Sequence, residues 1–374
     1  MKILHTADWH LASPMESKLT KEQAKQRRGE LLSRFADMIH YAEENGIAAV
    51  LLCGDLSDSG VLPYEVQDYV LSLIAHSAGV QFFLIAGNHD PECETAIGGC
   101  LTRGRRAIPE NLHVFEDGWK TFSVGEGVFV SGAALPREEE AVVLPTLAQD
   151  GYHIVMLHGQ IVDSTGTWGG EACRIPLGAF RECGMDYLAL GHDHAFRHRK
   201  LNARCTWCYC GSPEGRGFDE CGEHGFVVLT LEGGVCRNAE FVQFAVRTLH
   251  DISLDVTDVP ADSYATEQAI ERCVSTIPER DLVRVTLVGV DEESGDRGLA
   301  YLAQRLAERF FYAEIVDKTE VRVDADAYKA DVSLRGEFVR AVLADEALSE
   351  EERTEILRLG LSALAGEDFG VTGV

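Results

Sequence analysis

The sequence of 374 residues has no apolar run long enough to cross a membrane, and it has little basic charge for its size. A membrane-spanning helix needs about 20 predominantly apolar residues, so we expect no membrane span. The first ten residues, MKILHTADWH, lack the apolar core and the small-residue cleavage site of a signal peptide. We therefore expect a cytoplasmic location.

Lysine and arginine are scarce relative to acidic residues. The chain has 34 basic and 61 acidic residues, which gives a formal net charge of −27. The phosphates of nucleic acids attract basic surfaces, so such a chain should bind duplex DNA only weakly by itself. The acidic balance argues that firm binding of DNA would need another subunit.

The eleven cysteines do not form the pattern of a disulfide framework or of a zinc site. Disulfide frameworks belong to short secreted chains, and structural zinc sites combine two separated ligand pairs. The densest group lies on an apparent strand, where Cys208 and Cys210 share one face and Cys205 lies on the other. We expect reduced thiols, and the sequence leaves open whether this group has a further role.

Residues 1–246 alternate short apolar runs with helical stretches, which is typical of a layered α/β domain. A helix is expected over Lys21–Glu44, which ends at an Asn45–Gly46 termination signal, and another from Pro63 to about His76. Five runs have the shortness and apolarity of buried strands: Ile3–Ala7, Ala49–Cys53, Gln81–Ala86, Ile154–Leu157 and Tyr187–Leu190.

The composition changes near Thr248, where the pattern of a second and smaller domain begins. Strand and helix patterns alternate there as β-α-β-α-β, which predicts a small α+β domain over residues 247–328. Residues 329–374 have the pattern of an acidic helical tail with a capping box at Ser349 and Glu352. This tail carries an apolar stripe that predicts either packing within the domain or a docking face for a partner: Ile356, Leu357, Leu361 and Leu364.

Polar groups that can bind metal ions follow each of the five apolar runs. They are Asp8 and His10 in DWH, Asp55 in GDLSD, Asn88, His89 and Asp90 in GNHD, His158 in LHG, and His192 and His194 in GHDH. Side chains at the carboxyl ends of strands in an α/β sheet meet at one edge. Imidazole, carboxylate and amide donors suit Mn²⁺, Fe, Zn²⁺ or Mg²⁺, and a bridging carboxylate can hold two cations ~3.5–4 Å apart. Each motif alone is compatible with an ordinary turn, but their joint order predicts a two-metal phosphoesterase.

These ordered motifs resemble those of the calcineurin-like metallophosphoesterase superfamily. The segments HTADWHL, GNHDP, LALGHDH and GSPEGRGFDECGEHGF are similar, more narrowly, to those of SbcD-type DNA repair exonucleases and their YhaO-like relatives. The resemblance covers about residues 1–230. It implies an α/β fold with a layered β-sandwich flanked by helices and a small α+β capping domain. It also implies a homodimer that works with an SbcC-like coiled-coil ATPase.

The resemblance further implies a role for each motif residue. One metal would be bound by Asp8, His10, Asp55 and His194, and the second by Asp55, Asn88, His158 and His192. Mn²⁺ is the expected ion, with Mg²⁺, Fe or Zn²⁺ as alternatives. His89 would act as a general acid/base at the scissile phosphate, with Asp90 orienting its imidazole. Asp58 stands where many family nucleases have His, so we expect it to act only through a hydrogen bond to a ligand.

Candidates for phosphate contact are few. Arg103, Arg105 and Arg106 form the densest basic cluster, and Arg216 lies in the segment GRGF. Each is equally compatible with a solvated loop. The leading hypothesis is a metal-dependent DNA exonuclease. The alternatives are a phosphodiesterase or phosphatase for nucleotides or small phosphoesters and, from another class, a regulatory subunit whose metal site is structural.

Overall fold

The computed structural model describes the chain except residues 16–17, 92, 117, 148–149, 171–172, 293–296, 323–327, 329–330 and 366–374. The chain divides into two compact units, Met1–Thr248 and Leu249–Val374. The further division of the second unit into a capping domain and a helical tail stays a prediction, and residues 366–374 of that tail lie outside the described residues. None of the helices in the described part of the chain has the length and apolarity that a bilayer crossing requires.

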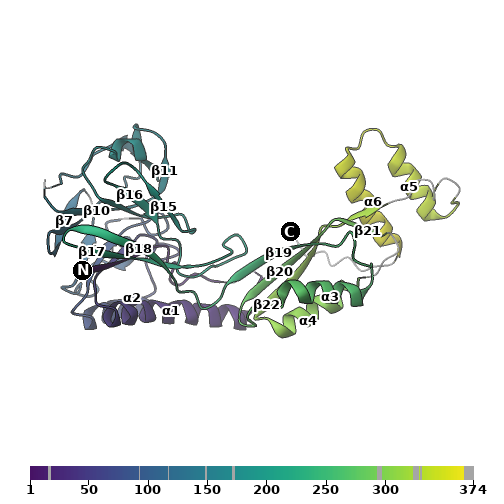
Figure 1. Cartoon of the computed structure of the whole chain (residues 1–374), viewed down its shortest axis with the longest axis horizontal. Coiled ribbons are helices and arrows are strands. Elements are labelled where there is room, and N and C mark those ends of the chain that lie inside the picture. The colour runs from purple at the N-terminus through teal and green to yellow at the C-terminus, as the bar shows by residue number, and fades with distance from the viewer. Residues whose placement is uncertain are drawn as a thin grey trace. The chain divides into compact units, whose positions relative to one another are not determined.

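Two six-stranded sheets form the centre of the first unit (Figure 1). The first sheet has the order β18 (Val235–Gln243), β17 (Gly225–Glu232), β1 (Lys2–Thr6), β2 (Ile47–Cys53), β3 (Gln81–Ile85) and β6 (Leu112–Phe115). The second has the order β15 (Arg197–Lys200), β16 (Thr206–Tyr209), β14 (Tyr187–Gly191), β10 (Tyr152–His158), β8 (Val128–Gly132) and β7 (Lys120–Gly125). Strands β1, β2, β3 and β6 are parallel, and so are β8, β10, β14 and β16.

The inner strands are apolar on both faces because both faces are covered. Ile3 of the first sheet and Met156 of the second lie in one apolar core between the sheets. The opposite face of the first sheet, which includes Leu4, packs against α1 (Lys21–Glu44) and α2 (Tyr64–His76). Strands buried on both faces have continuous apolar sequences, which is the pattern of the five predicted runs. The predicted sandwich flanked by helices is confirmed.

A small sheet covers the outer side of the second six-stranded sheet, and the sequence pattern did not predict it. Its strand order is β11 (Gln160–Val162), β13 (Arg174–Pro176), β12 (Thr167–Gly169) and β9 (Glu139–Ala141). The two remaining strands of the unit pair with each other, β4 (Ala96–Ile97) and β5 (Leu101–Thr102). The cysteines on β16 and directly beside it lie on the faces that the strand pattern predicts. Cys208 and Cys210 lie in the core between the large sheets, Cys205 lies in the core on the other side, and all eleven cysteines are free.

The second unit contains a parallel three-stranded sheet of β19 (Leu249–Asp255), β20 (Leu282–Val288) and β22 (Tyr312–Asp317). Helices α3 (Ser263–Val274) and α4 (Leu299–Arg309) share an apolar core with this sheet. Strands β21 (Val290–Glu292) and β23 (Glu320–Arg322) form a separate pair. The order of elements is the predicted β-α-β-α-β.

Two helices, α5 (Leu334–Ala344) and α6 (Glu350–Ala365), end the described part of the chain. The predicted capping box is present, because Ser349 and Glu352 exchange hydrogen bonds at the start of α6. The predicted apolar stripe is divided. Leu357 and Leu361 are buried in a cluster shared with α5, whereas Leu364 is exposed. A hollow of about 470 Å³ between the helices is lined by Phe338, Ile356, Leu359, Gly360 and Ala363.

Candidate metal centre

The metal-binding motifs lie at the carboxyl ends of parallel strands. Asp8 and His10 follow β1, Asp55 follows β2, Asn88 follows β3, His158 ends β10, and His192 and His194 follow β14. Within each sheet these strands are neighbours and run in the same direction. Their carboxyl ends therefore present the motif side chains to one place.

The backbone turns sharply where β1 and β2 end. Asp8, His10 and Asp55 have φ angles of 53°, 44° and 49°, values that residues other than glycine rarely adopt. Two hydrogen bonds hold these turns together, from the amide of Asp8 to the carbonyl of Gly54 and from the amide of His10 to the carbonyl of Asp55. Such strain persists only where the surrounding structure imposes it, and it is concentrated at functional sites.

Two glycines make room for the imidazole of His158. A Cβ atom on Gly54 would come within 2.3 Å of Nδ1 of His158, and one on Gly191 within 2.7 Å of the same atom. Both distances are too short for any side chain. The glycines of GDLSD and GHDH are therefore required because His158 lies against their backbone, and its Nδ1 atom is hydrogen-bonded to the carbonyl of Cys53.

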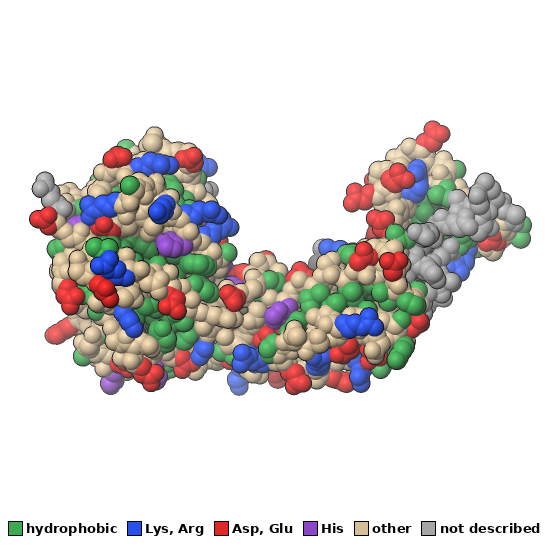
Figure 2. Space-filling model, in the orientation of Figure 1, with side chains coloured by type: hydrophobic (Ala, Val, Ile, Leu, Met, Phe, Trp, Pro, Cys, Tyr) green, Lys and Arg blue, Asp and Glu red, His purple; other side chains and the backbone are tan. Residues whose placement is uncertain are grey.

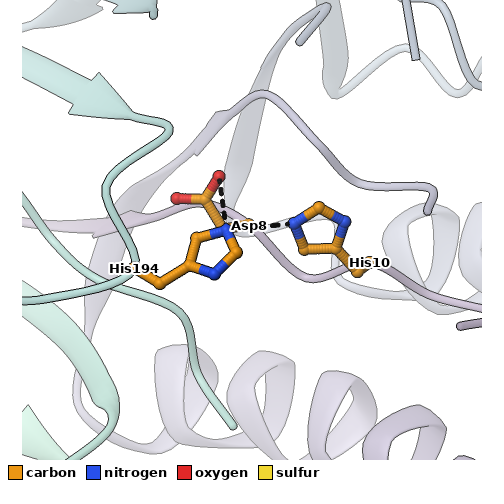
Figure 3. Close-up of side chains that lie close together, drawn as sticks. All are labelled: Asp8, His10 and His194. Carbon is orange, nitrogen blue, oxygen red and sulfur yellow. Dashed lines mark hydrogen bonds and ion pairs between the residues drawn. The ribbon is translucent and has the colours of Figure 1, made fainter. Parts of the chain in front are cut away.

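A first group of donors is formed by Asp8, His10 and His194, whose side chains point toward one another (Figure 3). The Nε2 atoms of His10 and His194 are 3.3 Å apart. The Nε2 atom of His194 also lies 3.9 Å from a carboxylate oxygen of Asp8. Two imidazole nitrogens this close repel each other through their lone pairs unless a proton or a cation lies between them, so this geometry fits a metal ion.

A second group lies beside the first and shares Asp55 with it. The side-chain oxygen of Asn88 lies 2.9 Å from Nε2 of His158 and 2.8 Å from Nδ1 of His192. The Oδ2 atom of Asp55 lies 3.3 Å from Nε2 of His158 and 3.8 Å from Nε2 of His10. The same carboxylate oxygen thus faces both groups, as a bridging ligand must. All the predicted ligands are brought together, and their role as ligands stays a prediction.

Burial and charge repulsion together make this cluster favourable for cations. Burial raises the pKa of Asp8 to about 6, and the carboxylate of Asp55 adds to that effect. Burial alone would also raise the pKa of Asp55, but the attraction of His158 holds it below its usual range. Burial would lower the pKa of His158, but attraction to Asp55 raises it to about 9. Divalent cations would offset the repulsion between the two buried carboxylates.

His89 is exposed and lies at the edge of the first group, with its ring 4.8 Å from that of His10. Its Nδ1 atom donates a hydrogen bond to the backbone carbonyl of Asp58 at 2.9 Å, so in the neutral ring the Nε2 atom carries the lone pair. We expected Asp90 to orient this imidazole, and the structure corrects that expectation. The buried carboxylate of Asp90 instead accepts hydrogen bonds from the backbone amides of Gly87 and Ser57, so it joins two loops of the site.

The four arginines predicted for phosphate contact have different surroundings. Arg103 pairs with Glu116, and both Arg105 and Arg106 pair with Asp68 on α2. Of the four, Arg216 is the one that lies against a proposed metal ligand. Its Nη2 atom is 3.5 Å from Nδ1 of His194, and its Nη1 atom is 2.8 Å from Oδ1 of Asp58. A contact between phosphate and any of the four stays a prediction.

Glu220 is a site residue that the motif analysis missed. Its Oε1 atom lies 2.7 Å from Nδ1 of His194, on the side of the ring opposite the first donor group. A carboxylate in this position fixes the tautomer and the orientation of a metal-binding imidazole. The only signal in the sequence was its place in GSPEGRGFDE, the segment that carries the narrower resemblance.

Comparison with known proteins assigns this site to a family. The model of the family described as calcineurin-like phosphoesterase matches residues 1–196, more than half of the chain. The chain belongs to this family. As a calcineurin-like phosphoesterase it is a phosphoester hydrolase, and its nitrogen and oxygen donors fit two divalent metal ions.

Curated relatives of this calcineurin-like phosphoesterase include components of a nuclease. The SbcD subunit of the nuclease SbcCD from Escherichia coli strain K12 is 23% identical over 367 residues, which cover 80% of this chain and 88% of that protein. The protein of the same name from Bacillus subtilis strain 168 is 26% identical over 268 residues, which cover 59% of this chain and 64% of that protein.

Two solved structures also match the phosphoesterase. A dimetal phosphatase from Danio rerio has a TM-score of 0.41 and 11% identity, covering 65% of this chain and 96% of its own. The protein TT1561 of Thermus thermophilus has a TM-score of 0.38 and 12% identity, and the match covers 64% of this chain and 98% of that protein.

Proposed function

We propose that this phosphoesterase is a DNA nuclease that uses two divalent ions, with Mn²⁺ as the preferred ion. We propose further that it acts in complex with an SbcC-like coiled-coil ATPase. The observation that carries the proposal is the carboxylate of Asp55, one oxygen of which faces both donor groups. The names of the curated relatives, both components of a nuclease, support DNA as the substrate. When bound, two such cations polarise a phosphoryl group and lower the pKa of a water molecule.

The protein residues then have separate tasks in hydrolysis. His89 is exposed beside the first donor group, and in its neutral ring Nε2 carries the lone pair, so this atom would accept a proton and, once protonated, give it to the leaving oxygen. The carbonyl of Asp58 keeps the imidazole in that tautomer. Asp90 holds the loops that carry His89 and Asp55 at a fixed separation.

Two separate hollows beside the donor groups support a diester rather than a monoester. A hollow of about 750 Å³ adjoins His192 and His194, and another of about 410 Å³ adjoins Asn88 and His158. A phosphodiester carries a substituent on each side of the scissile phosphate, and each hollow can receive one of them. Phe196, which is 39% exposed, lines the larger hollow and could stack against a base.

The charge of the chain supports a partner for DNA binding. The net charge is −27, and acidic and basic side chains are interspersed on the face drawn in Figure 2. We expect the chain alone to bind duplex DNA with a dissociation constant no tighter than ~10⁻⁴–10⁻⁶ M at physiological salt. The apolar hollow between α5 and α6 is the surface that we propose for the ATPase. We also propose that the chain forms a homodimer.

Acidic residues in the larger hollow favour a second candidate function. Asp193, Asp219, Glu220 and Glu223 line it and outnumber the basic Arg197 and Arg216, so the hollow would repel the continuous phosphate backbone of DNA more than a small substrate with a single phosphate. Hydrolysis of nucleotides or other small phosphodiesters is therefore the alternative.

One assay separates the two candidates. The purified chain with Mn²⁺ or Mg²⁺ is offered linear duplex DNA, single-stranded DNA, cyclic nucleotides and a chromogenic diester, with Asp55→Ala as the inactive control. Release of nucleotides from DNA, made faster by the ATPase, is the expected result. Turnover of cyclic nucleotides with DNA left intact would replace the nuclease by the small-substrate enzyme. A chain that binds two metal ions and turns over no phosphoester would point to the regulatory subunit instead.

A further inference from the structure

Asp58, Arg216 and Glu220 form one ion-paired cluster beside the first donor group. The Nη1 atom of Arg216 donates to Oδ1 of Asp58 at 2.8 Å. Its Nη2 and Nε atoms donate to Oε1 of Glu220 at 3.2 Å and 3.3 Å, and its backbone amide donates to the other oxygen at 2.9 Å. One guanidinium therefore joins a carboxylate of the GDLSD loop to one of the GSPEGRGFDE segment.

Each of these carboxylates also faces a histidine of the first donor group. Oε1 of Glu220 lies 2.7 Å from Nδ1 of His194, and Oδ1 of Asp58 lies 3.2 Å from Nδ1 of His10. The Nε2 atoms of the same two histidines face each other at 3.3 Å. The imidazole of His194 is thus held on its outer nitrogen by a hydrogen bond to Glu220, whereas the outer nitrogen of His10 has the Asp58 carboxylate beside it without a hydrogen bond. The inner nitrogens of both rings point to a common place.

We propose that Arg216, with Asp58 and Glu220, is a positioning device for the first metal ion. Arg216 fixes the two carboxylates, Glu220 fixes the imidazole of His194, and Asp58 places its negative charge beside the imidazole of His10. The affinity for the cation depends on that arrangement. This inference rests on the two-metal centre of the proposed function. It gives Arg216 a task different from phosphate contact.

Charge argues for positioning over phosphate contact. The guanidinium is shared by two carboxylates, so the three groups carry a net charge of −1. Arg216 lines the larger hollow described above together with Asp193, Asp219, Glu223 and Arg197. It also lines a further hollow of about 370 Å³ together with Asp58 and Asp219. A phosphate approaching from either hollow meets a negative surface, whereas a divalent cation beside the imidazoles is attracted by it.

The test is a Mn²⁺ titration of the full chain by calorimetry, which needs no substrate. Arg216→Ala should bind one of the two ions ~10–100-fold more weakly and the other as in the wild type. Glu220→Gln should weaken the binding of the same ion. Arg216→Lys, which keeps the charge, should weaken it less than Arg216→Ala does. The matched control is Arg204→Ala, because Arg204 also holds a carboxylate through two nitrogens, that of Asp186, but contacts no residue of the donor groups.

Kinetics with a chromogenic diester complete the test. At saturating Mn²⁺, Arg216→Ala should regain most of its kcat, with KM for the diester within about twofold of the wild type. If Arg216→Ala bound both ions as tightly as the wild type, the proposal would be overturned. If its KM for the diester also rose by about tenfold or more, Arg216 would be identified as a phosphate contact. The proposed nuclease fails separately, because a chain that does not cleave DNA still gives a metal isotherm.

Discussion

The Oδ2 atom of Asp55 lies 3.3 Å from Nε2 of His158, and both side chains are almost completely buried. Water can therefore hardly take the place of this carboxylate. We expect Asp55→Ala to bind fewer than one Mn²⁺ per chain, in place of two, because the same oxygen faces both donor groups. Metal content by mass spectrometry and turnover of a chromogenic diester measure the change, and turnover should fall to background. Asp68→Ala, on the exposed side of α2, serves as control and should keep both ions. Two ions bound to Asp55→Ala would show that the carboxylate is not shared.

Affinity for Mn²⁺ should rise with pH between about 6 and about 9. In the metal-free site burial raises the pKa of Asp8 to about 6, and attraction to Asp55 raises that of His158 to about 9. Metal ions bind only the deprotonated forms, so each proton competes with the cation. At a pH of about 7.5 Asp8 is already mostly ionised and His158 is still protonated, so binding should release at least one proton. Burial would lower the pKa of His194, but the hydrogen bond to Glu220 raises it, so this ring adds to the protons released. Titration calorimetry in two buffers with different ionisation enthalpies measures the protons released. An affinity that is constant across this pH range would contradict the charges described here.

His89→Ala should separate catalysis from metal binding. His89 lies at the edge of the first donor group, and its role is to transfer a proton, so its loss should lower kcat by ~10²–10⁴-fold. Mn²⁺ content should stay at two ions per chain. His89→Gln, which keeps a polar side chain but cannot act as an acid or base at neutral pH, should be equally slow. If either variant kept wild-type turnover, the general acid/base would have to be another group.

A buried ion pair should stabilise the segment that carries Arg216 and Glu220. Arg27 of α1 donates to Glu214 at 3.0 Å and to the carbonyl of Gly215 at 2.7 Å, and both charged side chains are almost fully buried. Arg27→Ala would leave the Glu214 carboxylate without its main partner, so the free energy of unfolding should fall by about 3–5 kcal/mol.

Urea denaturation measures the change. Lys25→Ala, exposed on the same helix, should change the free energy of unfolding by less than about 0.5 kcal/mol. Replacing both partners, as Arg27→Met with Glu214→Leu, should recover much of the loss because no unpaired charge remains. If Arg27→Ala lowered the free energy of unfolding no more than Lys25→Ala does, the ion pair of Arg27 and Glu214 would contribute nothing to stability.

The hollow between α5 and α6 should be where the ATPase docks. Leu359 lines it and is 41% exposed, so a charge there would be tolerated by the fold but not by an apolar interface. We expect Leu359→Asp to abolish co-purification with the ATPase and to leave hydrolysis of a small diester unchanged. Val235→Asp, on β18 and 50% exposed, is the matched control and should co-purify normally. Normal co-purification of Leu359→Asp would place the docking surface elsewhere.

The sequence alone determined the layered α/β order of the first unit and which metal-binding side chains gather there, whereas the sandwich was implied by the family resemblance. Apolar runs with no polar alternation predict strands covered on both faces, and the structure has them in β1, β2, β3, β10 and β14. The bounds of α1 followed from apolar spacing and the Asn45–Gly46 signal. The end of a strand is visible in the sequence as the point where an apolar run stops. The motif residues follow such points, so they could be predicted to meet at one edge of the sheets. These are local properties of the chain.

Only the tertiary structure decided which side chains hold the motif residues in place. Asp90 bonds two backbone amides rather than the neighbouring His89, because the turns around it bring those amides closer to its carboxylate. Glu220 reaches His194 although its segment has no metal-binding pattern of its own. Contacts of this kind depend on how loops of unusual backbone geometry meet at the edge of two sheets. That meeting is fixed by packing across the whole first unit, and no local pattern in the sequence records it.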